Sequence, residues 1–225
     1  SWYERKTQQQ AALQIVKYQG RTTSEGDASS RWSHRDLIRL AHPYSQDQFH
    51  NALYDYATHL WEPEKESKIK MVSESTRSLI NNSKELRLVL GHEKAKKAEN
   101  AKDVIAIIEE YEIPRESIPS KWQNDPDVWK ALLPNMPLVG LIRTLNRATS
   151  YGILKPMSKE LNIVIDKLSY GEYIKKSRLH PLQILVAMKQ YSAGRGDKGS
   201  LTWTPVQEVL DALDKAFYLS FGFVE

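Results

Sequence analysis

Apolar side chains recur every three or four residues along most of this chain, and that spacing predicts amphipathic α-helices. Strict alternation of apolar and polar residues, which would predict β-strands, is almost absent. Residues 73–100 are predicted to form one long helix or two. We expect further helices over residues 2–19, 33–42, 47–61, 101–111, 126–133, 137–147, 158–168, 170–176, 181–191 and 205–221.

The predicted helices are short, and most of them end near a proline or a glycine. Gly20 follows the first helix, and Pro43, Pro63 and Pro134 mark the ends of later helices. Proline has this effect because it disfavours helical geometry at the residue before it. Short helices joined by short turns favour antiparallel helix pairs packed side by side. The sequence has no exact repeat, so we predict an all-α, α-solenoid-like fold whose repeats are structural only.

Composition limits the class of protein without choosing a function. The 225 residues are enough for one large domain or two small ones, and 40% hydrophobic with 27% charged residues is typical of a soluble globular protein. Cysteine is absent, so disulfides and thiolate sites are excluded, which fits a reducing compartment. No apolar run approaches the roughly 20 residues that span a bilayer, and the start does not resemble a signal peptide. The net charge of +4 permits a nucleic-acid partner.

The stretch from Arg31 to Pro43 has the features of a short helix with two chemical faces. Ser33 is placed to cap its first turn, and Asp36 suits the positive end of the helix dipole. The predicted apolar face consists of Leu37, Ile38, Leu40 and Ala41. The remaining side chains are basic or protonatable, and they must face either solvent or an anionic partner: Arg31, His34, Arg35, Arg39 and His42.

Basic residues gather in two parts of the sequence. The first group lies in two predicted adjacent helices and the loop between them, and consists of Lys17, Arg21, Arg31, His34, Arg35, Arg39 and His42. The second group is accompanied by one acid, Asp197, and consists of Lys175, Lys176, Arg178, Lys189, Arg195 and Lys198. A solvated helix face is the ordinary alternative for either group. Two clusters near glycine-containing loops nevertheless indicate contacts with the phosphates of RNA.

Four further residues are candidates whose roles the sequence leaves open. His180 precedes Pro181 at a predicted helix start, where it either caps the helix and packs or contacts RNA. Arg143 and Arg147 lie one turn apart on a predicted helix and are included as RNA-binding candidates. Trp32 is as well suited to packing as to stacking on a base.

No pattern in the chain supports an enzyme or a cofactor site. Ser33, His34 and Asp36 include the residue types of a catalytic triad, but close neighbours on one helical turn do not bridge one another as a triad requires. No His-Glu-x-x-His motif accompanies the dispersed histidines. Gly194, Gly196 and Gly199 match a dinucleotide-binding spacing but follow a predicted helix rather than a strand, so we predict a flexible basic loop.

Three motifs in the same order resemble the Ro autoantigen family of TROVE-domain proteins. The first is Trp-Ser-His-Arg-Asp-Leu-Ile-Arg-Leu-Ala-His-Pro at residues 32–43. The second is Pro-Leu-Val-Gly-Leu-Ile-Arg-Thr-Leu at 137–145. The third begins Ser-Arg-Leu-His-Pro-Leu at 177–182 and continues to the glycine-rich loop at 194–199. Together they span nearly the whole chain.

The resemblance implies a specific architecture and function. Proteins of the Ro family have a ring of HEAT-like helical repeats that binds Y RNA on its basic outer surface. Single-stranded ends of misfolded noncoding RNA enter near the ring interior, so the implied role is cytoplasmic RNA quality control. Y RNA and other small noncoding RNAs are the implied partners, with an exoribonuclease or another RNA-processing protein as a further one. No membrane partner and no cofactor are implied.

The resemblance also assigns roles to individual positions. Lys17, His34, Arg35 and Arg39 match the Y-RNA-binding region, and Arg178, His180 and the loop at 194–199 match a region toward the ring interior. We expect residues 1–225 to be the C-terminal portion of a TROVE domain, part of such a ring. A von Willebrand factor A-like domain with its Asp-x-Ser-x-Ser metal motif is expected to be absent. The alternative is a helical protein–protein scaffold of the telomerase- or vault-associated TROVE type.

Overall fold

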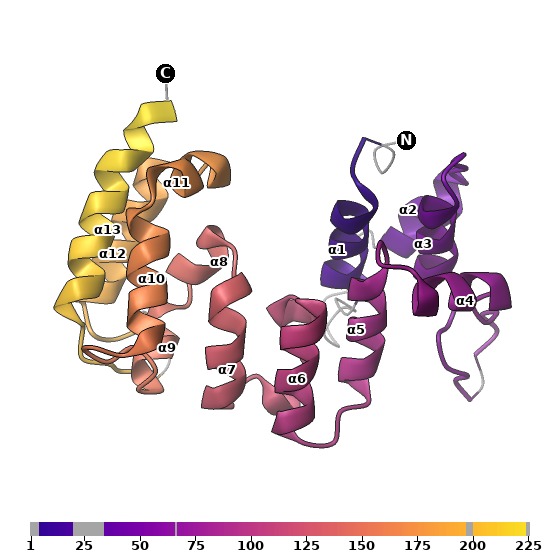
Figure 1. Ribbon diagram of the computed structural model, residues 1–225, viewed down its shortest axis with the longest axis horizontal. Helices are drawn as coiled ribbons and strands as arrows, with labels where there is room; N and C mark the ends of the chain where they lie inside the picture. The colour runs from indigo at the N-terminus through magenta and orange to yellow at the C-terminus, as the bar shows by residue number, and fades with distance from the viewer. Residues whose placement is uncertain (1–4, 20–33, 66, 197–199, 224–225) are drawn as a thin grey trace. The chain divides into compact units, whose positions relative to one another are not determined.

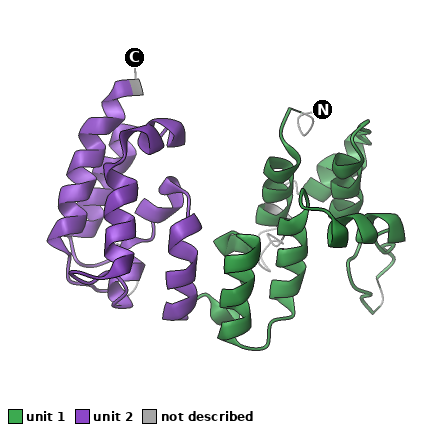
Figure 2. Cartoon of the chain, viewed as in Figure 1, with its two compact units in different colours: residues 1–123 green, residues 124–225 purple. Residues whose placement is uncertain are grey.

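The computed structural model describes residues 5–19, 34–65, 67–196 and 200–223. These residues form thirteen α-helices and four short 3-10 helices. Across the described ranges, β-structure is limited to two isolated bridges, Leu60 with Met71 and Arg195 with Thr202. The predicted all-α class is therefore confirmed. The chain divides into two compact units, residues 1–123 and 124–225 (Figure 2).

The first unit contains six α-helices. In chain order they are α1 Gln8–Gln19, α2 His34–Ala41, α3 Gln48–Thr58, α4 Glu74–Asn82, α5 Arg87–Lys96 and α6 Ala101–Tyr111, followed by η1 Arg115–Ser117 and η2 Ser120–Trp122. Helices α5 and α6 run side by side in opposite directions and are joined by a short turn (Figure 1). This is the antiparallel pairing that the helical spacing predicts.

Helix starts in the first unit follow from capping side chains. Asp47 accepts a hydrogen bond from the Phe49 amide at 2.8 Å, and Asn100 accepts one from the Asp103 amide at 2.9 Å. Such caps satisfy amides that have no partner within the helix. The first helix begins at Gln8 rather than at the predicted residue 2, and the Thr7 hydroxyl accepts from the Gln10 amide at 3.3 Å. A cap within the predicted helix therefore sets its start.

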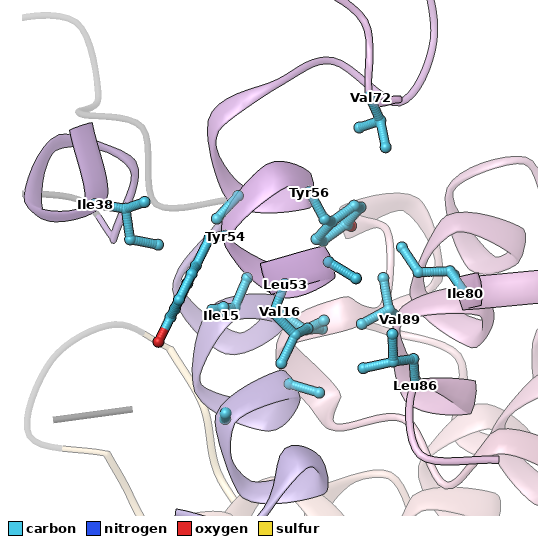
Figure 3. Packing of buried hydrophobic residues seen from close by; sticks show 14 residues of the cluster. Ile15, Val16, Ile38, Leu53, Tyr54, Tyr56, Val72, Ile80, Leu86 and Val89 are labelled. Atoms are coloured by element: carbon cyan, nitrogen blue, oxygen red, sulfur yellow. The ribbon is translucent and has the colours of Figure 1, made fainter. Parts of the chain in front are cut away.

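The core of the first unit lies where α1, α3 and α5 meet. Ile15 on α1, Leu53 and Tyr56 on α3 and Val89 on α5 are almost completely buried in one cluster (Figure 3). The Tyr56 hydroxyl donates a hydrogen bond to the buried carboxylate of Glu93. The Lys96 ammonium lies 2.6 Å from the same carboxylate. This pairing makes the burial of a charged group tolerable.

The second unit contains seven α-helices. They are α7 Pro126–Leu132, α8 Leu138–Ile142, α9 Leu145–Ser150, α10 Lys159–Ser169, α11 Gly171–Ser177, α12 Pro181–Ser192 and α13 Gln207–Leu219, with η3 Leu133–Asn135 and η4 Ser220–Phe223. Helix α13 packs against both α10 and α12, and its buried side chains are Val209, Ala212, Leu213 and Ala216. The predicted starts at Asp125-Pro126 and Ser158 are confirmed by their capping hydrogen bonds.

One predicted helix is two helices in the structure. Residues 137–147 were expected to be continuous, but α8 ends at Ile142 and α9 begins at Leu145. The Thr144 amide bonds to the Leu141 carbonyl, three residues back, and its hydroxyl donates to the Gly140 carbonyl at 3.1 Å. A threonine that bonds locally in this way competes with the regular i−4 ladder. Arg143 and Arg147 are consequently not neighbours on one helix, as the sequence had suggested.

Candidate nucleic-acid interface

Helix α2 carries three residues of the first basic group, His34, Arg35 and Arg39, and only one of its side chains is buried. Ile38 is its buried residue and points toward Tyr54 on α3 (Figure 3). Arg39 and His42 are exposed, whereas Arg35 is half-buried with its Nε atom enclosed and without a hydrogen-bond partner in the described part of the chain. The helix thus presents Arg39 to solvent while it holds Arg35 closer to the protein.

The predicted apolar face of α2 is wrong in its extent. Leu37 is 49% exposed, Leu40 is 66% exposed and Ala41 is also exposed, so Ile38 alone of the predicted set is buried. An eight-residue helix has only two turns, and here one side chain carries its contact with the core. The surface around Arg39 is therefore mixed, with apolar and basic groups together.

His34 begins α2 in a half-buried position. Burial lowers the pKa of His34 below its ordinary value of 6.5, because the charged imidazolium loses solvation. The imidazole is therefore neutral at pH 7. At this position it offers hydrogen bonding rather than positive charge.

Lys17, at the end of α1, already has a carboxylate partner. Its ammonium lies 3.6 Å from Glu116 on η1, and both side chains are about one-third exposed. A partly exposed pair at this distance neutralises some of the charge that the sequence had assigned to RNA. Arg21, Arg31 and Lys198 lie outside the described residues, as do Ser33 with its predicted cap and Trp32.

The second basic group begins at the C-terminal end of α11. Lys175 and Lys176 lie in its last turn, where cations interact favourably with the helix dipole. Arg178 follows with a φ of +51°, a left-handed conformation that ordinarily favours glycine. All three side chains are exposed. An arginine held in this strained conformation projects from a fixed backbone position.

His180 caps helix α12, which was one of the two roles that the sequence left open for this residue. Its Nδ1 accepts a hydrogen bond from the Leu182 amide at 3.2 Å, and the Gln183 side chain accepts from the His180 amide at 3.4 Å. Accepting at Nδ1 leaves the proton of the neutral ring on Nε2. The exposed Nε2–H group therefore remains a donor for an external acceptor.

Hydrogen bonds and a β-bridge brace the two ends of the glycine-rich loop. Gly194 has a φ of +67°, and an added Cβ there would lie 3.0 Å from the Trp203 carbonyl oxygen. The Trp203 amide donates to the Gly194 carbonyl at 3.0 Å, and Arg195 forms a bridge with Thr202. The Trp203 indole also donates to the Tyr191 carbonyl at 2.8 Å. Arg195 is thus presented, exposed, by a braced turn.

Arg143 and Arg147 lie in different surroundings. Arg143 is exposed and lines a groove of about 280 Å³ with Leu182 and Val186 of α12. Arg147 is half-buried, with its guanidinium 5.9 Å from the ring centroid of Trp129. Arg147 is therefore engaged in packing, and Arg143 borders an apolar surface.

Most of the described candidate cations are not neutralised within the fold. Within the ranges that the structure describes, no carboxylate pairs with the following exposed residues: Arg39, Arg143, Lys175, Lys176, Arg178, Lys189 and Arg195. Lysines elsewhere in the chain do pair, as Lys97 does with Glu62 and Lys130 with Asp127. Within each unit, such unpaired cations favour an anionic partner.

Sequence reasoning missed a surface pocket of about 600 Å³ near the α10–α11 junction, lined by Pro134, Asp166, Lys167, Ser169, Tyr170 and Tyr173. Tyr170 and Tyr173, three residues apart at a helix start, were the available signal. In the described part of the chain, no three metal-binding side chains come together. None of its helices has the length and apolar character needed to cross a membrane.

Comparisons with known proteins agree with the motifs. Residues 3–191 match the TROVE domain model. Two relatives, each 32% identical, are RNA-binding protein RO60 of Caenorhabditis elegans and RNA-binding protein RO60 of Deinococcus radiodurans. They match 98% and 99% of this chain, respectively, which corresponds to 37% and 38% of their own lengths.

The crystal structure of the Deinococcus radiodurans RO (RSR) protein is also similar, with a TM-score of 0.70 and 32% identity. The match covers 99% of this chain and 40% of that one, and it confirms the predicted helical-repeat class. The chain spans about two fifths of the length of these relatives. Because the domain model and the relatives agree over almost all of its residues, the chain belongs to the TROVE-domain family.

Proposed function

We propose that this chain is an RNA-binding scaffold of the Ro ribonucleoprotein type and not an enzyme. The observation that carries the proposal is the set of exposed cations that lack carboxylate partners in the described residues, above all Lys175, Lys176 and Arg178 around the end of α11. Two relatives named RNA-binding protein support it. Phosphate contacts with counterion release would supply most of the affinity.

The α2 surface is the proposed site for Y RNA, on the basic outer face of the scaffold. Arg39 and His42 are exposed there, and Arg35 lies one turn before Arg39. The neutral His34 would contribute a hydrogen bond. Structured RNA is recognised largely through its backbone and shape, so this mixed surface needs few contacts with base edges.

The second basic group is the proposed site for single-stranded ends of misfolded noncoding RNA, near the ring interior. This site offers three groups of hydrogen-bond donors that suit phosphate oxygens: the guanidinium groups of Arg178 and Arg195 and the Nε2–H of His180. The biological role would be RNA quality control in the cytoplasm. An exoribonuclease or another RNA-processing protein is the proposed protein partner.

Paired variants test the proposal by fluorescence anisotropy with a labelled RNA stem that ends in a single-stranded tail. The outer variant combines Arg35→Ala with Arg39→Ala, and the second variant combines Lys175→Ala with Lys176→Ala. We expect each to weaken binding roughly tenfold near physiological salt, because two phosphate contacts are lost. Two further lysines, Lys97 and Lys130, serve as the matched control.

The control variant, Lys97→Ala with Lys130→Ala, makes the same change in net charge. Both of its lysines are already paired with carboxylates, at 2.7 and 2.8 Å. We expect its affinity for RNA to match that of the parent chain. If all three double variants weakened binding equally, only net charge would matter, and the proposed sites would be wrong.

A helical protein–protein scaffold is the second candidate function, and the groove between α8 and α12 favours it. Leu182 is 59% exposed and Val186 is 47% exposed beside Arg143 in this groove. Such a scaffold would purify without nucleic acid and bind its partner with little dependence on salt. The ratio of absorbance at 260 and 280 nm of the purified chain distinguishes the two functions.

A further inference from the structure

The pocket of about 600 Å³ near the start of α11 is not explained by the basic groups. Asp166, Lys167 and Ser169 come from the end of α10, Tyr170 and Tyr173 from the start of α11, and Pro134 from η3. Helix α10 contacts η3 directly. The pocket therefore lies within the second unit and has the size of a small-molecule site.

Two tyrosine rings give the pocket its character. Tyr170 is 63% exposed and Tyr173 is half-buried. In the part of the chain that the structure describes, neither hydroxyl has a hydrogen-bond partner. A large aromatic ring left this exposed, beside a second ring, offers a flat surface on which another planar group can stack.

Lys167 forms a fixed part of the pocket wall. Its ammonium donates hydrogen bonds to the carbonyls of Leu133 and Met136 at 3.0 and 2.9 Å, and lies 5.8 Å from the ring centroid of Tyr173. Burial lowers the pKa of Lys167 from its ordinary value. The lysine thus holds η3 and α10 together, and its donors are directed at the backbone rather than at a ligand.

The charges around the pocket indicate which part of a ligand would enter it. Asp166 is exposed, and within the described ranges no basic side chain forms an ion pair with its carboxylate. It would therefore repel a phosphate. Lys175 and Lys176, exposed and unpaired among the described residues, lie farther along the same α11 helix. A neutral planar group would therefore occupy the pocket, while anionic groups attached to it would meet the lysines.

We propose that this pocket takes one unpaired base of a single-stranded RNA, stacked on Tyr170, with the flanking phosphates directed toward Lys175 and Lys176. The inference rests on the proposed RNA-binding function and adds a specific subsite to it. Stacking on aromatic side chains is a general way to hold unpaired bases, because every base has a π-face. The site would distinguish unpaired from paired RNA.

The test measures the affinity of the full 225-residue chain for a short single-stranded RNA, for the same RNA with abasic positions, and for a fully paired duplex. We expect Tyr170→Ala to weaken binding of the intact single strand roughly 5- to 150-fold, the effect of losing one stacked base. Tyr170→Phe should bind like the parent chain, because the ring is kept. Circular dichroism checks that each variant is folded.

The other RNAs and a control residue make the outcomes distinct. Tyr170→Ala should not change binding of the abasic strand or of the duplex, since neither presents a base to the pocket. Tyr218→Ala removes another exposed tyrosine, 68% accessible on α13, and should leave single-strand affinity unchanged. An equal loss on all three RNAs would show that Tyr170 acts on the fold or on phosphates, and would overturn the stacking site.

Two negative results would have different meanings. If the parent chain binds single-stranded RNA but Tyr170→Ala binds it equally well, the stacking subsite is wrong and the proposed function stands. If the parent chain binds none of the RNAs, the proposed function fails, and the subsite fails with it. Binding of a proline-rich peptide that Tyr170→Ala abolishes, without any effect on RNA, would assign the pocket to a protein partner and overturn the inference.

Discussion

At the scale of single residues, His92 is a buried histidine whose two ring nitrogens have no hydrogen-bond partner in the described part of the chain. Burial, with a smaller contribution from Lys96, lowers the pKa of His92 to about 3. The neutral ring is therefore the form that the fold accepts. In the unfolded chain the pKa of this histidine is near 6.5, so at mildly acidic pH the unfolded chain binds a proton there more readily than the folded chain does.

This difference predicts acid sensitivity. Stability that is present above pH 6.5 is lost as the pH falls toward 3, by about 2 kcal/mol between pH 7 and pH 5 for this one group. We expect His92→Leu to remove that part of the pH dependence without lowering stability at pH 7. Urea unfolding followed by circular dichroism at the two pH values measures it, with the exposed His42→Asn as the control. Equal pH dependence in His92→Leu and the parent chain would contradict this account.

Arg178 allows stability and binding to be separated. Its φ of +51° costs about 1 kcal/mol for a residue with a Cβ. Replacement by glycine relieves this strain, but it makes the unfolded chain more flexible and so destabilises the folded state by about 0.5–1 kcal/mol. We expect Arg178→Gly to leave thermal stability almost unchanged and yet to weaken RNA binding. Glu112→Gly, at a φ of +53° after α6, is the matched control and should leave both properties unchanged. If Arg178→Gly binds RNA like the parent chain, Arg178 is not a contact.

At the scale of helices, the α5–α6 pair depends on a close approach at Gly91. This residue is buried, and an added Cβ would contact the Tyr111 side chain and lie 2.7 Å from Cγ2 of Ile113. Both neighbours are themselves buried, so neither can move freely. The absence of a Cβ at this position lets the two helices pack together.

Gly91→Ala is therefore expected to destabilise the chain by about 1–3 kcal/mol through overpacking. Gly140→Ala is a matched control within another helix, where the nearest atom to the added Cβ is the Met136 Cγ at 3.5 Å. This second change should be neutral or slightly stabilising, because alanine favours the helix by about 1 kcal/mol. Urea unfolding of the two variants measures the difference, and equal effects would argue against a tight helix contact at Gly91.

Several helix starts were predictable from local capping signals, although the Thr7 cap before α1 was missed. The caps at Asp47 and Ser158 and the Asp125-Pro126 start are encoded within a few residues, and the structure places helices after each of them. The break at Thr144 was missed because threonine is also common inside helices, and only its hydrogen bonds to Gly140 and Leu141 reveal the interruption.

At the scale of the whole molecule, contacts between distant segments could not be read from the sequence. The pairing of Lys17 with Glu116 joins α1 to η1, and periodicity carries no information about such a contact. The exposure of Leu40 likewise depends on how α2 packs against α1 and α3, which the sequence does not show. The pocket beside Tyr170 requires η3 to lie against α10. The sequence therefore identified basic residues but could not say which of them the fold leaves unpaired.

The central claim is that the unpaired cations of this TROVE-domain chain hold RNA through its phosphates. It is tested most directly by measuring the dissociation constant of the chain for a small structured RNA with a single-stranded tail across a range of salt concentrations. The account predicts a steep linear fall of affinity on a logarithmic plot, and a slope smaller by roughly 1–2 after Lys175→Ala with Lys176→Ala. An affinity independent of salt, or a slope unchanged in that variant, would contradict it.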